Sequence, residues 1–286
     1  RQRQMCIRDR TKHIQELEAA YQTRLFDRQG SRISLTEAGK LLLEHCERIL
    51  EDYKRLEYEM HLLHNEYTGG LKLGASTTVA QYVLPPLLAS FIGKFPHVNL
   101  SLLNGNSREI EAALQEHRID LGFVEGVFRL PNIKYTTFLK DELVAVVRTG
   151  SKLAIGEEIT PEELLHLPLV LRERGSGTLD VFERALQQHN IKLSSLQVLM
   201  YLGSTESIKL FLEHTDCLGI VSIRSITREL YSGQLRVVEI KDMPMLRDFS
   251  FAQPQGQESG LAQVFMQFAM HYNLSLIHIS EPTRHL

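Results

Sequence analysis

Residues 11–39 read TKHIQELEAAYQTRLFDRQGSRISLTEAG, and this stretch decides how the start of the chain folds. Residues 12–20 repeat apolar side chains at helical spacing without glycine or proline, which predicts a helix. The letters QGS then separate two short runs that each contain arginine, which is typical of a small β-hairpin or wing. A second helix is expected to begin nearby, because Ser34 and Glu37 have capping-box spacing and Thr36 is itself a good N-cap.

The expected helix over residues 36–68 carries an apolar seam. Leucine or isoleucine recurs every seven residues, and a second apolar residue follows four positions after each of the first three, as in a coiled coil. The helix either lies on its own domain or pairs with a second copy of the chain, and the narrow seam favours pairing. The expected dimerisation residues are Leu42, Ile49, Tyr53, Leu56, Met60 and Leu63.

Beyond the paired glycines at 69–70 the pattern changes to alternating strands and helices. This rhythm is typical of βαβ units and predicts an α/β fold with a largely parallel sheet. The rhythm occurs twice, which predicts two lobes: residues 71–147 with 248–273, and residues 148–247. Because the last helix is expected to return to the first lobe, the chain should cross between the lobes twice.

Ligands of open α/β sheets bind beyond the carboxyl ends of the strands, where helix N-termini point. At these positions the sequence places mostly small hydroxylated residues, which together with helix N-termini suit an anion. Each residue alone could equally be a helix cap. Arg172 and Arg174 are the candidate positive charges, and Arg174 is the one predicted to contact the ligand. The predicted effector-binding residues are Ser76, Thr77, Thr78, Asn106, Ser107, Arg174, Ser176, Thr178, Ser204 and Thr205.

Composition narrows the class of protein. The net charge of −3 gives no global basic field, so a nucleic-acid site must be local. The three cysteines are far apart, which indicates a reducing compartment. Together with the lack of a membrane-length apolar run or a signal peptide at the start of the chain, this predicts a cytoplasmic protein. Nucleophile-elbow, HExxH and Walker motifs are missing, so we expect no enzyme, no cofactor and no metal.

Residues 11–39 resemble the DNA-binding end of LysR-type transcriptional regulators, whose pattern is S-x-x-I-x-x-L-E-x-x-L-G-x-x-L-F-x-R followed by a wing and L-T-x-A-G. Thr11 stands for the serine of the pattern, while Tyr21 and Gln22 replace its Leu-Gly pair, which should loosen the turn after the recognition helix. The matching residues are Ile14, Leu17, Glu18, Leu25, Phe26, Arg28, Leu35, Thr36, Ala38 and Gly39.

The resemblance implies a winged helix-turn-helix over residues 11–35, present here in part, then a dimerising linker helix and a two-lobed effector domain of the periplasmic-binding-protein type. It implies operator DNA, a small anionic effector and further copies of the chain, in a dimer or a tetramer, as partners. By the resemblance, the residues that contact DNA are Thr11, Lys12, Gln15, Arg28, Arg32 and Thr36.

The effector lobes resemble the branch of regulators of sulfur assimilation and carbon fixation, which suggests sulfite or a related sulfur oxyanion, or a carboxylate. A solute-binding protein of the same two-lobed fold is the alternative function, and the wing motif counts against it. An enzyme acting in the cleft is a further rival, for which the sequence shows no acid–base or nucleophile set.

The two ends of the chain do not fit this scheme. Codons for RQRQMCIRDR and LSLIHISEPTR can be chosen so that one segment contains ATGTGTATAAGAGACAG and the other its reverse complement. The segments therefore resemble the adaptors of a transposase-based sequencing library. We expect residues 1–10 and 274–286 to be translated adaptor. We expect the remainder to be a fragment that dimerises and binds effector but binds operator DNA weakly.

Overall fold

The computed structural model describes residues 2–29, 32–64, 67–126, 129–153, 156–255 and 260–277. The chain divides into two compact units, residues 1–65 and 66–286, which are described separately.

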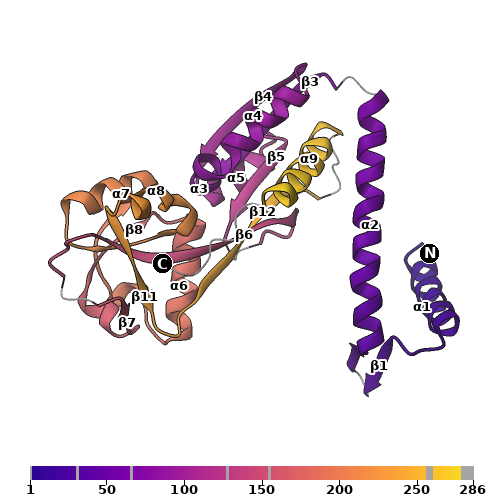
Figure 1. Cartoon of the computed structure of the whole chain (residues 1–286), viewed down its shortest axis with the longest axis horizontal. Coiled ribbons are helices and arrows are strands. Elements are labelled where there is room, and N and C mark those ends of the chain that lie inside the picture. The colour runs from indigo at the N-terminus through magenta and orange to yellow at the C-terminus, as the bar shows by residue number, and fades with distance from the viewer. Residues whose placement is uncertain are drawn as a thin grey trace. The chain divides into compact units, whose positions relative to one another are not determined.

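The first unit is a helix, a hairpin and a long helix (Figure 1). These elements are α1 (Gln2–Tyr21), β1 (Phe26–Gln29), β2 (Arg32–Leu35) and α2 (Glu37–His64). The two strands pair antiparallel, which confirms the predicted hairpin. Glu18 joins helix to hairpin, because its carboxylate accepts from the backbone N–H groups of Leu25 (2.8 Å) and Phe26 (3.3 Å).

Thr36 sets the start of α2. Its hydroxyl donates to the Arg24 carbonyl (2.7 Å) and accepts from the Gly39 N–H (3.0 Å), so it is the N-cap. Ser34 lies within β2 and does not form the alternative capping box. A Cβ at Gly39 would lie 2.1 Å from the Leu25 carbonyl oxygen, so only glycine allows this close approach.

Gln22 ends α1 in the left-handed region, with φ of 50°. The LysR pattern has glycine at this position, which adopts such a conformation without a Cβ penalty. The turn is therefore formed in this chain, at a backbone cost of about 1–2 kcal/mol.

The predicted seam of α2 is an exposed apolar stripe within this chain. Ile49, Tyr53, Leu56 and Met60 are all at least half exposed, and Leu42 is partly buried. The side chain of Leu63 lies outside the described residues. Pairing through this stripe stays a prediction, which its exposure favours.

Within the described residues, the second unit is built on one sheet of ten strands (Figure 1). Its main order is β4-β3-β5-β12-β6-β10-β8-β9, and β11 joins the sheet through β6 and carries β7 on its other edge. The strands β3, β4 and β5 are parallel to one another, as are β8, β9 and β10. This confirms the predicted α/β class and places one parallel group in each lobe.

Lobe I contains the first parallel group and its helices. The helix breaks at Val83, and the double proline falls in the first turn of α4, where a missing N–H costs nothing. The elements are β3 (Gly69–Ser76), α3 (Thr77–Tyr82), α4 (Leu84–Lys94), β4 (Val98–Gly105), α5 (Ser107–Gln115), β5 (Leu121–Glu125) and α9 (Gly260–Ile277).

Lobe II repeats the design with helices on both faces of its strands. Buried residues of α6 pack on one face and those of α7 on the other. The elements are β7 (Glu158–Ile159), β8 (Pro168–Arg172), α6 (Gly177–Gln188), β9 (Gln197–Leu202), α7 (Thr205–His214), β10 (Leu218–Ser222), α8 (Thr227–Tyr231) and β11 (Leu235–Ile240), with short 3₁₀ turns at Glu163–His166, Leu193–Ser195 and Ile223–Ser225.

Two long antiparallel strands make the predicted crossings between the lobes. They are β6 (Ile133–Arg148) and β12 (Met245–Pro254), and they pair along most of their length. From Leu143 onward β6 packs in the core of lobe II. Ile133 near the start of β6 packs in the core of lobe I, so β6 continues as one strand through both cores.

The last helix packs on lobe I. The Phe91 ring on α4 lies 4.7 Å from that of Phe265 and 5.2 Å from that of Phe268, both on α9. This aromatic cluster is what returns the end of the chain to the first lobe.

Replacing Phe91 by alanine tests this docking. Phe91 is fully buried, so Phe91→Ala should lower the free energy of unfolding of this unit by about 3–5 kcal/mol. The neighbouring Ile92 is half exposed, so Ile92→Ala should cost well under half of that. Urea unfolding followed by circular dichroism measures both, and equal losses would contradict the assigned packing.

Candidate effector site between the two lobes

The carboxyl ends of the parallel strands from both lobes meet at the crossing strands. Ser76 ends β3 and Arg172 ends β8, while Thr77 and Thr205 begin the helices α3 and α7. All four residues are buried. The fold thus brings residues of two distant segments together at the carboxyl ends of parallel strands, which is where open α/β sheets bind their ligands.

Arg172 is the centre of this cluster. Its side chain is 1% exposed, and its guanidinium donates to Thr77 Oγ1 of lobe I (3.4 Å) and to Thr205 Oγ1 of lobe II (3.5 Å). It also donates to the Gly203 carbonyl (3.3 Å) and to the carboxylate of Glu173. One buried cation therefore contacts hydroxyls from both lobes.

Ser76 leaves a buried polar atom without a partner. Its side chain is buried, and its Oγ has no hydrogen-bond partner among the described residues. A buried hydroxyl without a partner is costly, so it favours a ligand or ordered water at that point. The orphaned hydroxyl belongs to the residue directly before Thr77, which contacts Arg172.

The sequence pattern favoured Arg174 over Arg172 as the arginine that contacts the ligand, whereas the structure places Arg172 in the buried cluster and Arg174 at the surface. Arg174 is exposed and lies two residues beyond the end of β8. Arg172 is the last residue of the buried strand and stays inside.

Several other predicted residues act as caps or local ties. Asn106 forms a capping box with Glu109, and Ser204 accepts from the Ser207 N–H (3.1 Å). Ser176 accepts from the Thr178 N–H (3.2 Å), and Ser107 bonds the backbone of Glu125. These contacts account for the residues structurally, so an effector role for them stays a prediction.

A buried ion cluster lies at the crossing itself, and sequence reasoning missed it. Arg247 of β12, with a fully buried side chain, lies 2.7 Å from a carboxylate oxygen of Asp141 on β6 and 3.0 Å from one of Glu125. It also donates to Thr178 Oγ1 of α6 (3.0 Å). Glu125 ends the otherwise apolar strand β5 (Leu121–Glu125), whereas β6 and β12 carry several charged residues, so the sequence pattern does not single out Asp141 and Arg247.

The same cluster extends to further elements on both sides. Thr78 of α3 donates to Glu125 (3.2 Å), and Ser222 of β10 donates to Asp141 (2.7 Å). Burial raises the pKa of Glu125, and this outweighs the opposing effect of the neighbouring Arg247 and Arg172 guanidinium groups. Thr78 and Thr178, both predicted effector residues, are thus tied into the crossing.

The lobes also touch at their surfaces. The Tyr82 hydroxyl of α3 donates to the Glu206 carboxylate of α7, and the Lys209 ammonium lies 5.3 Å from the Tyr82 ring centroid. On the other side, a Cβ at Gly177 would lie 2.2 Å from the Glu125 carbonyl oxygen. The glycine allows α6 of lobe II to approach the end of β5, and the structure is a closed arrangement of the two lobes.

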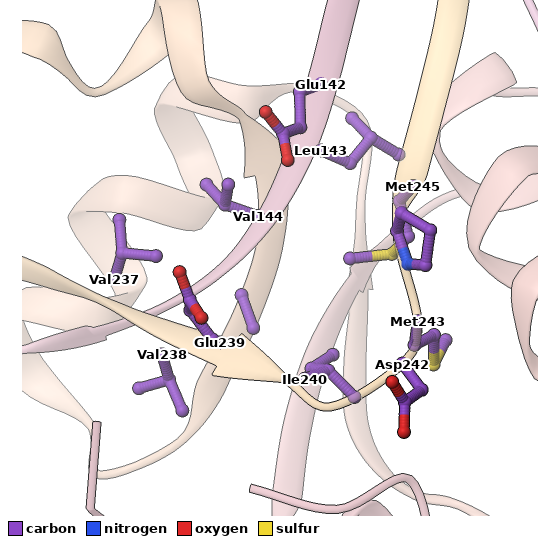
Figure 2. Close-up of a pocket in the computed structure, with 12 residues that line it drawn as sticks. Glu142, Leu143, Val144, Val237, Val238, Glu239, Ile240, Asp242, Met243 and Met245 are labelled. Carbon is purple, nitrogen blue, oxygen red and sulfur yellow. The ribbon is translucent and has the colours of Figure 1, made fainter. Parts of the chain in front are cut away.

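Two cavities elsewhere are a poor match for an anion. The first, of about 240 Å³, lies where β11 and β12 leave β6 (Figure 2), and its lining includes Glu142, Glu239 and Asp242 but no lysine or arginine. The second, of about 320 Å³, has three carboxylates in its lining against one arginine, Arg108. The Arg172 cluster is therefore better suited to a negative ligand.

The predicted DNA-contacting residues are only partly described. Lys12 is exposed and lies 3.8 Å from the Glu16 carboxylate one turn along α1, and Gln15 is exposed. The Thr36 hydroxyl is engaged as the N-cap of α2. The side chains of Thr11, Arg28 and Arg32 lie outside the described residues.

Among the residues that the structure describes, no group of three or more histidine, cysteine, aspartate or glutamate side chains could hold a metal ion. No helix in that part of the chain is long and apolar enough to span a bilayer.

A helix–hairpin–helix unit followed by two lobes around a buried arginine is the organisation of a ligand-responsive DNA-binding protein. The family models agree: residues 10–40 match the bacterial regulatory helix-turn-helix of the LysR family, and residues 64–273 match the LysR substrate binding domain. The chain belongs to the LysR family of transcriptional regulators and contains that family's effector-binding domain.

Relatives support this assignment. The chain is 34% identical over 227 residues to the uncharacterized HTH-type transcriptional regulator YeiE of Escherichia coli K12, covering 79% of this chain and 75% of that protein. It is 26% identical to HTH-type transcriptional regulator CysL of Bacillus subtilis, covering 84% and 79%. It is 29% identical to the RuBisCO operon transcriptional regulator of Acidithiobacillus ferrooxidans, covering 89% and 82%.

A solved structure shares the two-lobed domain. The regulatory domain of CcmR from Synechocystis PCC6803, in complex with 2-PG, matches with a TM-score of 0.65 and 28% identity, covering 72% of this chain and 97% of that one. The chain thus shares with it the predicted periplasmic-binding-like architecture.

Removing the central arginine of the crossing should destabilise the effector domain strongly. Arg247→Met would leave two buried carboxylates without their cation, and breaking such a pair typically costs about 3–5 kcal/mol. Arg224→Met is the control, because Arg224 approaches Asp141 only at 3.6 Å from a 42% exposed position. That exposed contact is worth at most about 1 kcal/mol. Chemical unfolding of both variants should show this difference, and similar losses would exclude a special role for Arg247.

Proposed function

We propose that this LysR-family regulator responds to a small anion held between its lobes by Arg172. The supporting observation is the position of that guanidinium, which is buried and contacts Thr77 and Thr205 from opposite lobes. A ligand that bonds to both sides would strengthen the contacts between the lobes, and so shift the population of conformations of the assembled chains. The proposed output is a change in how assembled chains bind or bend operator DNA.

The chemistry of the cluster favours an oxyanion. Arginine presents a planar fork of N–H donors that matches the oxygens of carboxylates, phosphates and sulfur oxyanions. The unpartnered Ser76 hydroxyl adds a further hydrogen-bonding group. The related CcmR domain was solved with 2-PG, which supports an anionic effector here. Sulfite or a related sulfur oxyanion is the narrower proposal, and a carboxylate is its rival.

We further propose that the chain acts as a homo-oligomer. The α2 stripe is one exposed apolar surface. The outermost strands of the main sheet are two more, since β4 exposes Leu102 and Leu103, while β9 exposes Leu199, Met200 and Tyr201. Exposed apolar edge strands favour association with another chain. Pairing of copies would cover these surfaces.

We propose no enzymatic activity for the cleft and a cytoplasmic location. The relatives that the chain matches are transcriptional regulators, and the buried groups around Arg172 are hydroxyls and carbonyls. A solute-binding role has less support, because the match to the regulatory helix-turn-helix covers residues 10–40.

Anion titrations of matched arginine variants test the site. Sulfite, sulfate, O-acetylserine and 2-PG should be titrated calorimetrically into the parent chain, Arg172→Lys and Arg174→Gln. Arg172→Lys keeps the charge but loses the fork, and hydrogen bonds to charged groups are worth about 1.5–3 kcal/mol. The anion that binds should therefore bind Arg172→Lys about 10- to 100-fold more weakly.

Arg174→Gln is the control and should bind like the parent chain, since Arg174 is exposed. Binding that depends on Arg174 and not on Arg172 would contradict the site. Failure of all four anions to bind the parent chain would contradict the proposed oxyanion class.

A further inference from the structure

The shortest contacts of Arg172 are to its own neighbour in the chain. Its Nε donates to Glu173 Oε2 at 2.8 Å and its Nη2 to Glu173 Oε1 at 3.1 Å. Its contacts to Thr77, Thr205 and the Gly203 carbonyl are all longer, between 3.3 and 3.5 Å. The Glu173 carboxylate thus takes the two-oxygen position in which arginine would hold an acidic ligand.

The two partners differ in burial. The Arg172 side chain is 1% exposed and that of Glu173 is 27% exposed. The arginine is enclosed by both lobes, whereas the glutamate reaches it from the side of the solvent. If the pair separates, Glu173 can turn into water and Arg172 cannot.

The backbone of Glu173 is held at both polar groups. Its N–H donates to the Leu202 carbonyl (3.2 Å), and its carbonyl accepts from the Ser176 N–H (3.2 Å). Separation of the Glu173 carboxylate from Arg172 therefore needs only rotation of the Glu173 side chain, without movement of β8 or α6. Rotation of a partly exposed side chain is among the fastest motions of a folded protein.

The charges also permit an anion to take the place of the Glu173 carboxylate beside Arg172. A buried guanidinium without a counter-ion is strongly disfavoured, so Arg172 must keep a negative partner. An incoming oxyanion supplies that partner as Glu173 leaves, and the released carboxylate becomes hydrated. The cluster stays charge-balanced throughout.

We propose that Glu173 is an internal competitor that occupies the anion-binding face of Arg172 in the absence of effector and is displaced by the effector's acid group. This inference rests on the proposed function, because it requires Arg172 to face the ligand. It adds a rule of selectivity: the effector must offer at least two acceptor oxygens on one acid group, as carboxylates and sulfur or phosphorus oxyanions do. It also implies that the native chain binds its effector more weakly than the Arg172 cluster would without the competing Glu173 carboxylate.

The test is Glu173→Gln, compared with the parent chain. Glutamine has the same shape and keeps one oxygen for Arg172, so the buried guanidinium retains an acceptor while the competing charge is gone. Apparent affinity falls in proportion to the fraction of protein that is competent to bind. If Glu173 occupies the site most of the time, sulfate, sulfite or 2-PG should bind Glu173→Gln about 10-fold or more tightly than the parent chain by calorimetry.

Glu213→Gln is the matched control, because it removes the same charge from an exposed position on α7 of the same lobe. It should leave the affinity within about 2-fold of the parent, which excludes a general charge effect. Glu173→Asp is a second variant that keeps the charge on a side chain shorter by one methylene. It should also bind the anion more tightly than the parent, because the shorter side chain holds the guanidinium less well.

The outcomes separate this inference from the proposed function. Equal affinities of the parent chain and Glu173→Gln, with binding still lost in Arg172→Lys, would overturn the competitor role alone. Equal gains in Glu173→Gln and Glu213→Gln would also overturn it. If none of the three anions binds any variant, both the inference and the proposed oxyanion site are wrong.

Discussion

The buried guanidinium of Arg247 is the constraint on which the effector domain depends. A cation with a fully buried side chain must be surrounded by acceptors, and here those come from β5, β6 and α6, with further bonds to α3 and β10. The strands β6 and β12 form both crossings between the lobes. The ion pair between Asp141 and Arg247 joins these two strands. A change in the angle between the lobes therefore requires breaking bonds of this cluster, and breaking any one of them has a high cost in free energy.

The two buried arginines, Arg247 and Arg172, have different roles. Arg247 is neutralised by two acidic partners and joins the chain segments, so it is poorly placed to attract a further ligand. Arg172 has one carboxylate partner, reached from the side of the solvent, and long contacts to hydroxyls of both lobes. A ligand that takes over from Glu173 would strengthen contacts that already span the lobes. The Tyr82–Glu206 contact at the surface would add to the same closed arrangement.

Much of the fold was predictable because it depends on local chemistry. The hairpin at 26–35, the helix break at Val83 and the return of α9 to lobe I follow from turn residues, proline and apolar periodicity. The strand-end rule also singled out Ser76, Thr77 and Thr205, which are buried in the structure, the two threonines in contact with Arg172. By contrast, the choice between Arg172 and Arg174 depends on where β8 ends, and strand ends are the least certain feature of a sequence pattern. The cluster of Glu125, Asp141 and Arg247 joins residues more than a hundred positions apart, so no local pattern could pair them.

The central claim is that the Arg247 cluster fixes the lobes relative to each other. Its most direct test is the distance between spin labels at Glu116→Cys on lobe I and Tyr231→Cys on lobe II, both exposed positions, with the native cysteines replaced by alanine. Labelled chains should be diluted with unlabelled ones so that distances within one chain dominate. The account predicts one narrow distance distribution for Arg247 and a broad or longer one for Arg247→Met under conditions where that variant is folded. The same narrow distribution in both chains would contradict it.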